Sequence, residues 1–500
     1  MSPKAARFLP RRRDVESDAT YLRWSITGLE EMAPELSARR TLSSGQRRVM
    51  IGLVIVIGFA VLVFPLQVLV GINTLAVLVY SAAFVYSAVW FRSALLQPKL
   101  VTVTDEEARA VPDDLLPKYT VLVAAYHEAE VIGATIRALE RLDYPPERLE
   151  VKLLLEADDR DTIDAALEAS PPSHIQIVRV PPGEPRTKPK ACNFGLCTAT
   201  GDLVTIYDAE DRPEPLQLRR AAVAFSRLPD DVACVQAKLH YYNSTQNLIT
   251  RLFSAEYITW FSLMLPALLR LNAPIPLGGT SMHLRRDILE CVGAWDAHNV
   301  TEDADLGVRL RRFGFRTLIL DSVTLEEANS DFINWVKQRS RWHKGYMQTW
   351  LVHMRNPVLL HRELGLVGFW GFQLTLGITP LLALLNPLFW AVAGLWLVAK
   401  PPLVAELFPP VIYYPAMLCL ILGNFLGVYR TLVGLRVENQ TGLLLATLAS
   451  PLYWVMMAIA AIRAFLQLVI DPFLWEKTVH GLDQRSPSAE LESANPQMVG

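Results

Sequence analysis

The chain has 500 residues, enough for more than one domain, with 48 Lys and Arg, 50 Asp and Glu and a hydrophobic fraction of 51%. The formal net charge of −2 provides neither a basic surface nor an acidic tail, so we expect no nucleic-acid partner. The five cysteines form no CxxC pair and lie near no histidine at zinc spacing, which indicates free thiols rather than a disulfide framework or a zinc site.

A polar, Arg-rich leader over residues 1–48 precedes the first apolar run. An apolar run that starts this late is not typical of a cleavable secretory signal, and the positive-inside rule predicts that the leader is cytosolic. Residues 49–96 are expected to form two membrane helices, at 50–70 and 72–91, joined at Gly71. Each run is uncharged and about 20 residues long, which is enough to cross a bilayer. Two crossings would return the chain to the cytosol.

Residues 101–362 alternate short β-rich runs with helical stretches, the pattern of a parallel-sheet α/β domain. Ligands of such sheets bind at the carboxyl ends of the strands, so we expect functional side chains directly after these runs. The strands are predicted at 119–125, 149–155, 175–180, 202–207 and 232–239, and the helices at 130–142 and 162–169.

Apolar character resumes over residues 364–470, where we expect about two to four membrane crossings plus interfacial segments. The last apolar run, 443–470, is interrupted by Pro451, so it either crosses the membrane or bends back into the interface. Residues 471–500 are predicted to form a cytosolic segment and a disordered tail.

Acidic clusters follow two of the predicted strands, and a third opens a predicted helix. Taken singly, such acids are usually turn formers or helix caps. A later helix would place Gln338, Arg341 and Trp342 on one side, at i, i+3 and i+4. Because all these groups lie within one domain, we interpret them together as one site. The acids are Asp158 and Asp159, then Asp208, Glu210 and Asp211, and then Glu302 and Asp303.

In this order the motifs resemble the D, DxD, TED and QxxRW set of processive family 2 glycosyltransferases, such as cellulose, mannan, chitin and hyaluronan synthases. The resemblance covers most of the chain, from the first membrane helices to about Gly481. It implies an α/β GT-A domain, a Rossmann-like nucleotide-sugar-binding fold, inserted between transmembrane α-helices. It also implies a multi-pass protein of the cell (inner) membrane whose catalytic domain is cytosolic.

The same resemblance suggests where the donor sugar nucleotide binds. Asp208 and Glu210 align with DxD, where the second acid is usually Asp, so either Glu210 or the adjacent Asp211 would complete a site for Mg²⁺ or Mn²⁺. Asp158 or Asp159 resembles the acid that contacts the base and ribose. The further donor contacts that the resemblance implies are Tyr126, Glu128, Lys190, Gln338 and Arg341, the last as a clamp on the diphosphate.

Inverting transfer needs a general base that deprotonates the acceptor hydroxyl. Asp303 matches the aspartate of TED and is the predicted base, with Glu302 and Asp305 as alternatives. Neighbouring carboxylates tend to raise one another's pKa, which would help a base work near neutral pH.

On the acceptor side, Trp342 is expected to stack on a sugar, and Gly279 and Thr280 to border it in a loop of small residues. The run 475–481 resembles a gating loop that covers the nucleotide. Its candidate residues are Trp475, Lys477, Thr478 and His480.

These residues predict an inverting glycosyltransferase that uses a nucleotide sugar, a UDP-hexose ahead of a GDP sugar, to build and export a β-linked polysaccharide. Its expected partners are a growing glycan or lipid acceptor, membrane lipid and accessory export subunits. One alternative is a non-processive enzyme that transfers a single sugar to a lipid, and another is a non-catalytic nucleotide-sugar-binding scaffold. A transporter is disfavoured because the apolar spans carry few charges beyond Arg463.

Overall fold

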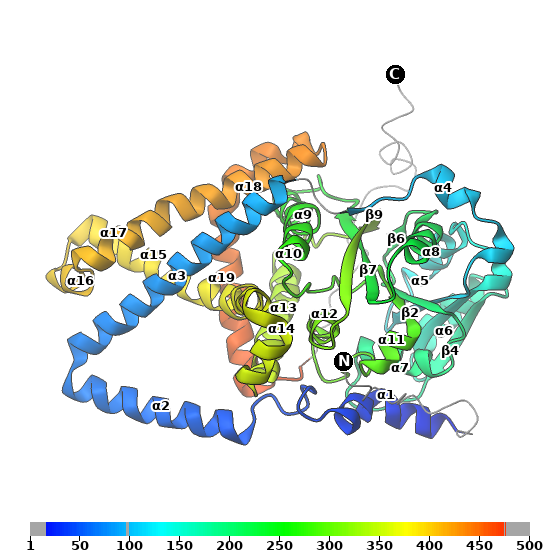
Figure 1. The fold of residues 1–500 in the computed structure, drawn as a ribbon, viewed down its shortest axis with the longest axis horizontal. Coiled ribbons are helices and arrows are strands. Elements are labelled where there is room, and N and C mark those ends of the chain that lie inside the picture. The colour runs from blue at the N-terminus through cyan, green and yellow to red at the C-terminus, as the bar shows by residue number, and fades with distance from the viewer. Residues whose placement is uncertain (1–16, 97–99, 475, 477–500) are drawn as a thin grey trace.

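The computed structural model describes residues 17–96, 100–474 and 476. Within that part of the chain, a mixed β-sheet with helices on both faces forms one side of the molecule. Long apolar helices extend away from it on the other side (Figure 1). The α/β architecture expected from the sequence is confirmed.

The described strands form one nine-stranded sheet in the order β1-β9-β7-β8-β5-β2-β3-β4, with β6 paired to β9. β5, β2, β3 and β4 are parallel, and the antiparallel β8 joins them to β7 and β9. The five predicted strands are confirmed to within two residues at each end. The strands are β1 (Leu100–Val101), β2 (Tyr119–Ala125), β3 (Leu149–Glu156), β4 (Ile175–Val180), β5 (Leu203–Tyr207), β6 (Arg212–Pro213), β7 (Val232–Tyr241), β8 (Met282–Arg285) and β9 (Arg316–Glu326).

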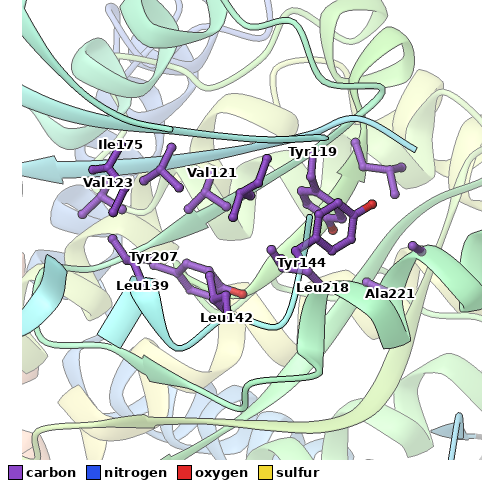
Figure 2. Close-up of a cluster of buried hydrophobic side chains, with 14 of the residues drawn as sticks. Tyr119, Val121, Val123, Leu139, Leu142, Tyr144, Ile175, Tyr207, Leu218 and Ala221 are labelled. Atoms are coloured by element: carbon purple, nitrogen blue, oxygen red, sulfur yellow. The ribbon is translucent and has the colours of Figure 1, made fainter. Parts of the chain in front are cut away.

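The sheet core explains why the central strands read as continuous apolar runs: both of their faces are covered. On one face, Val121 and Val123 of β2 lie in a buried cluster with Leu139 of α5 (Ile132–Glu140) and Leu218 of α8 (Gln217–Arg227) (Figure 2). The opposite face packs against α7 (Lys188–Cys197) through a second buried cluster. Tight packing on both faces holds the strand ends in fixed positions.

Several further helices pack around the sheet and the helices that cover it. α1 (Asp18–Met32), which lies in the polar leader, packs against α7. The others are α6 (Arg160–Glu168), α9 (Leu248–Thr259), the π-helical turn η3 (Trp260–Met264), α10 (Leu265–Arg270), α11 (Arg286–Cys291), α12 (Glu302–Arg312) and α13 (Phe332–His353).

Six stretches of the described chain are long and apolar enough to cross a membrane by length and composition. One of them, Leu248–Arg270, is mostly buried inside the protein, whereas the others expose large apolar side chains. Exposed apolar surface of this extent is typical of contact with lipid. The exposed stretches contain α2 (Ser44–Val63), α3 (Pro65–Leu95), α14 (Pro357–Phe372), α15 (Ile378–Ala399), α17 (Pro410–Leu418), α18 (Asn424–Val437) and α19 (Ser450–Ile470).

The junction between the first two apolar helices differs from the prediction. Gly71 lies inside α3, and the break falls at Phe64, before Pro65 at the start of α3. Proline lacks a backbone N–H donor and suits the first turn of a helix, so it separates the two helices where glycine does not. Pro451 acts in the same way, because the 3₁₀ turn η6 (Thr441–Ala449) gives way to α19 at that point.

Candidate functional site

A cavity of about 400 Å³ opens at the carboxyl ends of β2, β5 and β9 and is bounded by α12 and α13. It brings together segments that are up to 218 positions apart in the chain, from Ala124 to Trp342. Ten of the residues predicted from the sequence line it, and they are Tyr126, Glu128, Asp208, Glu210, Gly279, Glu302, Asp303, Gln338, Arg341 and Trp342.

The parallel pairing of β2 with β5 places two of these segments side by side. Val123 is in register with Tyr207, so Tyr126 and Asp208 leave the same edge of the sheet. Glu302 and Asp303 occupy the first turn of α12, where the helix dipole favours negative charge.

Lys188 supplies a cation that the sequence interpretation did not predict. Its ammonium group is ion-paired with Asp208 and donates a hydrogen bond to the Gly279 carbonyl oxygen, 2.8 Å away. Burial alone would lower the pKa of Lys188, but the Asp208 and Glu302 carboxylates outweigh this and raise it above its usual value. Lys188 therefore remains charged inside the cavity.

Lys190, the expected diphosphate contact, does not line the cavity. Its side chain is fully buried, and Nζ lies 2.7 Å from Glu156 Oε1. A step of two residues turns a helix by roughly 200°, so the lysines at 188 and 190 leave α7 in nearly opposite directions. Lys188, rather than Lys190, therefore lines the cavity.

Asp303 has a defined orientation at the cavity wall. Its Oδ1 accepts a 2.7 Å hydrogen bond from the Ala304 backbone N–H, and Oδ2 faces Gly279. A Cβ at Gly279 would lie 3.0 Å from this Oδ2, and the φ of +82° also favours glycine at that position. The lack of a side chain at Gly279 keeps one oxygen of Asp303 open to the cavity.

Burial raises the pKa of Asp303 to about 6. Burial, followed by the charge of Asp303, raises the pKa of Glu302 to about 8. The alternative base Asp305 is different, since Arg309 Nε at 2.6 Å and His353 Nε2 at 2.9 Å hold its carboxylate in a fully buried network. Asp305 does not reach the cavity, so the structure does not support it as the base.

Asp211 and Thr280 lie behind the cavity wall. Asp211 Oδ2 accepts a 2.7 Å hydrogen bond from the Asp208 backbone N–H and another from the Thr280 hydroxyl, while its Oδ1 has no hydrogen-bond partner in the described part of the protein. Burial, then the charges of Asp208 and Glu210, raise the pKa of Asp211 well above its usual value. These contacts give Asp211 and Thr280 a supporting position under Asp208.

The cavity lining is strongly acidic, with eight carboxyl side chains and three basic ones. No three His, Cys, Asp or Glu residues of the described chain already form a metal-binding group. The oxygen donors of Asp208 and Glu210 nevertheless suit a hard divalent cation, and the excess of acids favours one. The residues present therefore fit Mg²⁺ or Mn²⁺ in donor type and charge, with other ligands left to a bound molecule or water.

Asp158 and Asp159 have separate structural positions beside the cavity. Asp159 is buried and caps α6, accepting hydrogen bonds from the backbone N–H groups of Thr162 and His127. Asp158 is 2.8 Å from Arg186, and Arg186 in turn donates a 3.2 Å hydrogen bond to the Tyr126 hydroxyl. Arg186 lines the cavity, so Asp158 is connected to the cavity through its ion pair with Arg186.

Glu326 and Glu327, at the end of β9, also line the cavity and were missed in the sequence. Burial and the charges of Asp211 and Asp208 raise the pKa of Glu326 well above its usual value. The β-rich run over 316–326 ends in Glu326 and is followed directly by Glu327, a signal of the same kind as the acids after β3 and β5.

Residues of α13 form one wall of the cavity. Trp342 stacks on Tyr257 with ring centroids 5.9 Å apart and planes inclined by 22°, and the Arg339 guanidinium lies 4.3 Å from the centre of the Trp342 ring. Gln338 Oε1 accepts a 2.8 Å hydrogen bond from Asn329. The gating-loop candidates Trp475, Lys477, Thr478 and His480 lie outside the described residues.

Comparison with known proteins supports a glycosyltransferase domain. The family described as "Glycosyltransferase like family 2" matches residues 117–345. The chain is similar to the probable glycosyltransferase YdaM of Bacillus subtilis, at 28% identity over 244 residues, which are 46% of this chain and 55% of that protein. It thus spans about half the length of this curated relative.

Two other relatives differ in the acceptors that their names suggest. A beta-monoglucosyldiacylglycerol synthase of Trichormus variabilis is 26% identical over 377 residues, covering 73% of this chain and 77% of that protein. A probable glucomannan 4-beta-mannosyltransferase of Arabidopsis thaliana is 28% identical over 249 residues, covering 48% of this chain and 44% of that protein.

Among solved structures, the chain resembles the mannosyltransferase PcManGT from Pyrobaculum calidifontis in complex with GDP-Man and Mn²⁺. The TM-score is 0.54 at 19% identity, and the match covers 81% of this chain and 99% of that one. At this identity the likeness concerns the fold, which both proteins share. The α/β domain therefore has a GT-A-like fold, and its sequence is similar to that of family 2 glycosyltransferases over residues 117–345.

Proposed function

We propose that the protein is an inverting glycosyltransferase that moves a hexose from a nucleotide diphosphate sugar to a hydroxyl acceptor at a membrane. The main support is that Asp208, Asp303 and Arg341, from three distant parts of the chain, line one cavity. That cavity lies at the carboxyl ends of parallel strands, where α/β sheets bind nucleotides.

For donor binding, Lys188, Arg186 and Arg341 are the cations that line the cavity and would contact the diphosphate. Asp208 and Glu210 would hold the divalent cation, Mg²⁺ or Mn²⁺. When bound, this ion would offset negative charge on the departing nucleotide diphosphate. Asp211, through the Asp208 backbone, keeps the acidic turn in position. The donor would be a UDP-hexose or a GDP sugar.

Asp303 is the proposed base for the transfer step. The acceptor hydroxyl would attack C1 of the sugar while its proton moves to Asp303 Oδ2, the C1–O bond to the nucleotide breaks, and the configuration at C1 inverts. A pKa of about 6 leaves Asp303 ionised at neutral pH, whereas Glu302, at about 8, stays largely protonated and does not compete for the proton. The Ala304 N–H holds the other oxygen of Asp303.

The acceptor remains a choice between a growing glycan and a lipid hydroxyl. Trp342 presents an aromatic side chain at the cavity wall, which suits a pyranose ring and favours a β-linked polysaccharide with export through the apolar helices. The lipid alternative gains support from the diacylglycerol-modifying relative, which aligns over 73% of this chain. The size of the product distinguishes them.

We also propose a membrane arrangement for the chain. The leader over 1–48 and the domain over 101–362 would be cytosolic, between membrane helices at 49–96 and 364–470 in the inner membrane. Support comes from the exposed apolar stretches and from the arginines of the leader. The segment over 471–500 would return to the cytosol.

The test is turnover by the purified full chain, supplied with Mn²⁺ or Mg²⁺, a panel of UDP and GDP sugars, and total membrane lipid or oligosaccharide acceptors. Release of UDP or GDP with a matching labelled product would support the proposal. A labelled product that migrates with lipid after one addition indicates the lipid acceptor, and a ladder indicates a polymer. Nucleotide-sugar binding without release across the whole panel would instead support the scaffold alternative.

A further inference from the structure

A second cavity, of about 360 Å³, lies between the β1–β9 edge of the sheet, the end of α10 and the C-terminal half of α12. None of the described residues lines both cavities. The side chains of Leu269, Ile275, Phe315 and Leu318 make much of its wall apolar. Its charged lining residues are Arg311 and Arg316, and no acid of the described chain is among them.

Arg311 is unusual among the arginines around it. Arg309 pairs with Asp305, Arg312 with Glu363, and Arg316 with Asp231 through two hydrogen bonds. Arg311 differs from these three arginines, because its Nε is buried and has no hydrogen-bond partner among the described residues. A partly buried guanidinium with an unpartnered Nε, in a cavity whose described lining holds no acid, favours an anion from outside the chain.

The electrostatics of Arg311 agree with its geometry. Burial lowers the pKa of Arg311, and the charge of Arg316 lowers it further. A bound anion would reverse both effects, because it would replace lost hydration and offset the like charge. An anion with an apolar portion would also cover the leucine and phenylalanine side chains of the wall.

The cavity lies where the apolar helices meet the sheet domain. Leu100 and Val101, in its wall, follow the end of α3, and Leu269 lies near the end of the apolar stretch Leu248–Arg270. The Arg270 guanidinium holds these ends together by donating to the Leu96 carbonyl oxygen. Figure 1 shows α3, α10 and β9 converging at this boundary. If α3 crosses the membrane, lipid headgroups lie at the level of this cavity.

We propose that this second cavity binds an anionic phospholipid, with its phosphate at Arg311 and its apolar portion along Leu269, Ile275 and Phe315. The lipid would be a bound partner of the fold rather than the acceptor. Arg311 lies in the last turn of α12, at the opposite end from Asp303 in the first turn, and does not line the donor cavity. Failure of this proposal would therefore leave the proposed transferase function untouched.

The experiment uses the full chain in phosphatidylcholine nanodiscs that contain a small fraction of phosphatidylglycerol with a diazirine in its acyl chain. After irradiation, the crosslinked peptides are mapped. We expect crosslinks on residues 269–275 and 315–318. Arg311→Gln should reduce them at least about tenfold, because it removes one charge-assisted hydrogen bond to the phosphate. Arg311→Lys, which keeps the charge, should retain more than Arg311→Gln, and Arg137→Gln on the exposed side of α5 should match the wild type.

Competition identifies the ligand class. Unlabelled phosphatidylglycerol should abolish the mapped crosslinks, whereas inorganic phosphate and diacylglycerol should not, because each lacks half of the ligand. Displacement by inorganic phosphate alone would mean a simple anion site and overturn the proposal, as would undiminished crosslinking in Arg311→Gln. Arg311→Gln could also lower the unfolding temperature, so Leu269→Trp serves as a second variant that narrows the cavity and keeps the charge. Unchanged crosslinking in Leu269→Trp would also overturn the proposal.

Discussion

Lys188 and Asp208 form an ion pair inside the cavity that contains Asp303 and Arg341, although they come from the start of α7 and the end of β5. The same ammonium group holds the Gly279 carbonyl oxygen at 2.8 Å, beside the loop that keeps Asp303 open to the cavity. One buried cation thus links the acids proposed for metal binding to the wall proposed for the acceptor. It also balances some of the negative charge that the acidic lining would otherwise carry.

Replacing Lys188 is expected to weaken donor binding without unfolding the domain. Lys188→Met removes a cation from the diphosphate position, and losing one charge-assisted contact of about 1.5–3 kcal/mol corresponds to a rise of about 10- to 100-fold in the KM for the nucleotide sugar. The measurement is initial rate against donor concentration, with the unfolding temperature recorded alongside.

Lys190→Met is the matched control, two positions along the same helix. Because Lys190 is fully buried against Glu156, its loss leaves a buried acid without its partner and should lower stability by about 3–5 kcal/mol. Its effect should appear in the unfolding temperature first. If Lys190→Met raised KM more than Lys188→Met at equal stability, the placement of the phosphate at Lys188 would be wrong.

The pH profile is expected to show the ionisation of Asp303. Because the base must be deprotonated, kcat/KM should rise with pH, reach half its plateau near pH 6 and fall about tenfold per unit below that. The profile is measured at saturating divalent cation, with a slow and a fast alternative acceptor to separate chemistry from product release. A limb near pH 4, the ordinary value for an aspartate, would contradict the burial of Asp303.

The contribution of Asp303 to folding stability should fall as pH rises, whereas its contribution to activity should increase. Since the pKa of Asp303 is raised to about 6 in the folded chain from its ordinary value of 3.8, the folded state binds the proton more tightly than the unfolded chain does. Its stabilising contribution is therefore complete below pH 3.8 and lost as pH rises through about 6. Asp303→Asn should have an unfolding temperature at pH 8 that equals or exceeds that of the wild type, as measured by thermal unfolding in detergent.

The acidic turn after β5 predicts two different mutant phenotypes. Glu210 lines the cavity, so Glu210→Gln should raise the Mn²⁺ concentration for half-maximal activity by about 10-fold or more, with little change in stability. Asp211 is buried behind Asp208, so Asp211→Asn should mainly alter stability and the position of the turn. Metal titration followed by thermal unfolding distinguishes them. The reverse pattern would identify Asp211 as the metal ligand.

The position of Trp342 is expected to depend on a partly buried ion pair beside its ring. Arg339 pairs with Glu256 of α9 while its guanidinium lies against the Trp342 ring. Glu256→Gln should therefore raise the KM for the acceptor more than the KM for the donor, because it loosens Trp342 and leaves the diphosphate contacts in place. Two separate titrations, one of each substrate, provide the measurement. Equal changes in both constants would show a general loss of folding instead.

Much of the fold could be predicted because its signals are local. The strands at 119–125 and 175–180 are short β-rich runs whose predicted ends coincide with the observed ones. The break between the first two apolar helices was predicted at Gly71, because glycine is common in turns. In the structure Gly71 lies inside α3, and the break falls at Phe64. α1 was not predicted in the polar leader, because it is stabilised by packing on α7, through contacts such as Asn193 with the Ser25 carbonyl oxygen.

The site was harder to predict than the fold, because side-chain direction depends on tertiary contacts. The acids after β5 and at the start of α12 could be selected by position, yet Lys188 and Lys190 differ only in the direction each leaves α7. Glu326 was missed because the strand that ends there was not predicted. The two cavities also required the fold, since their walls combine segments from many elements.

The most direct test of the account compares wild type with Asp303→Asn in one experiment: binding of the preferred nucleotide sugar by calorimetry, and its turnover with acceptor. The account predicts that the variant binds the donor within about threefold of the wild type while the turnover rate falls by about 10²–10⁴-fold, the usual contribution of a general base. Turnover within about tenfold of the wild type, with the variant correctly folded, would contradict Asp303 as the base.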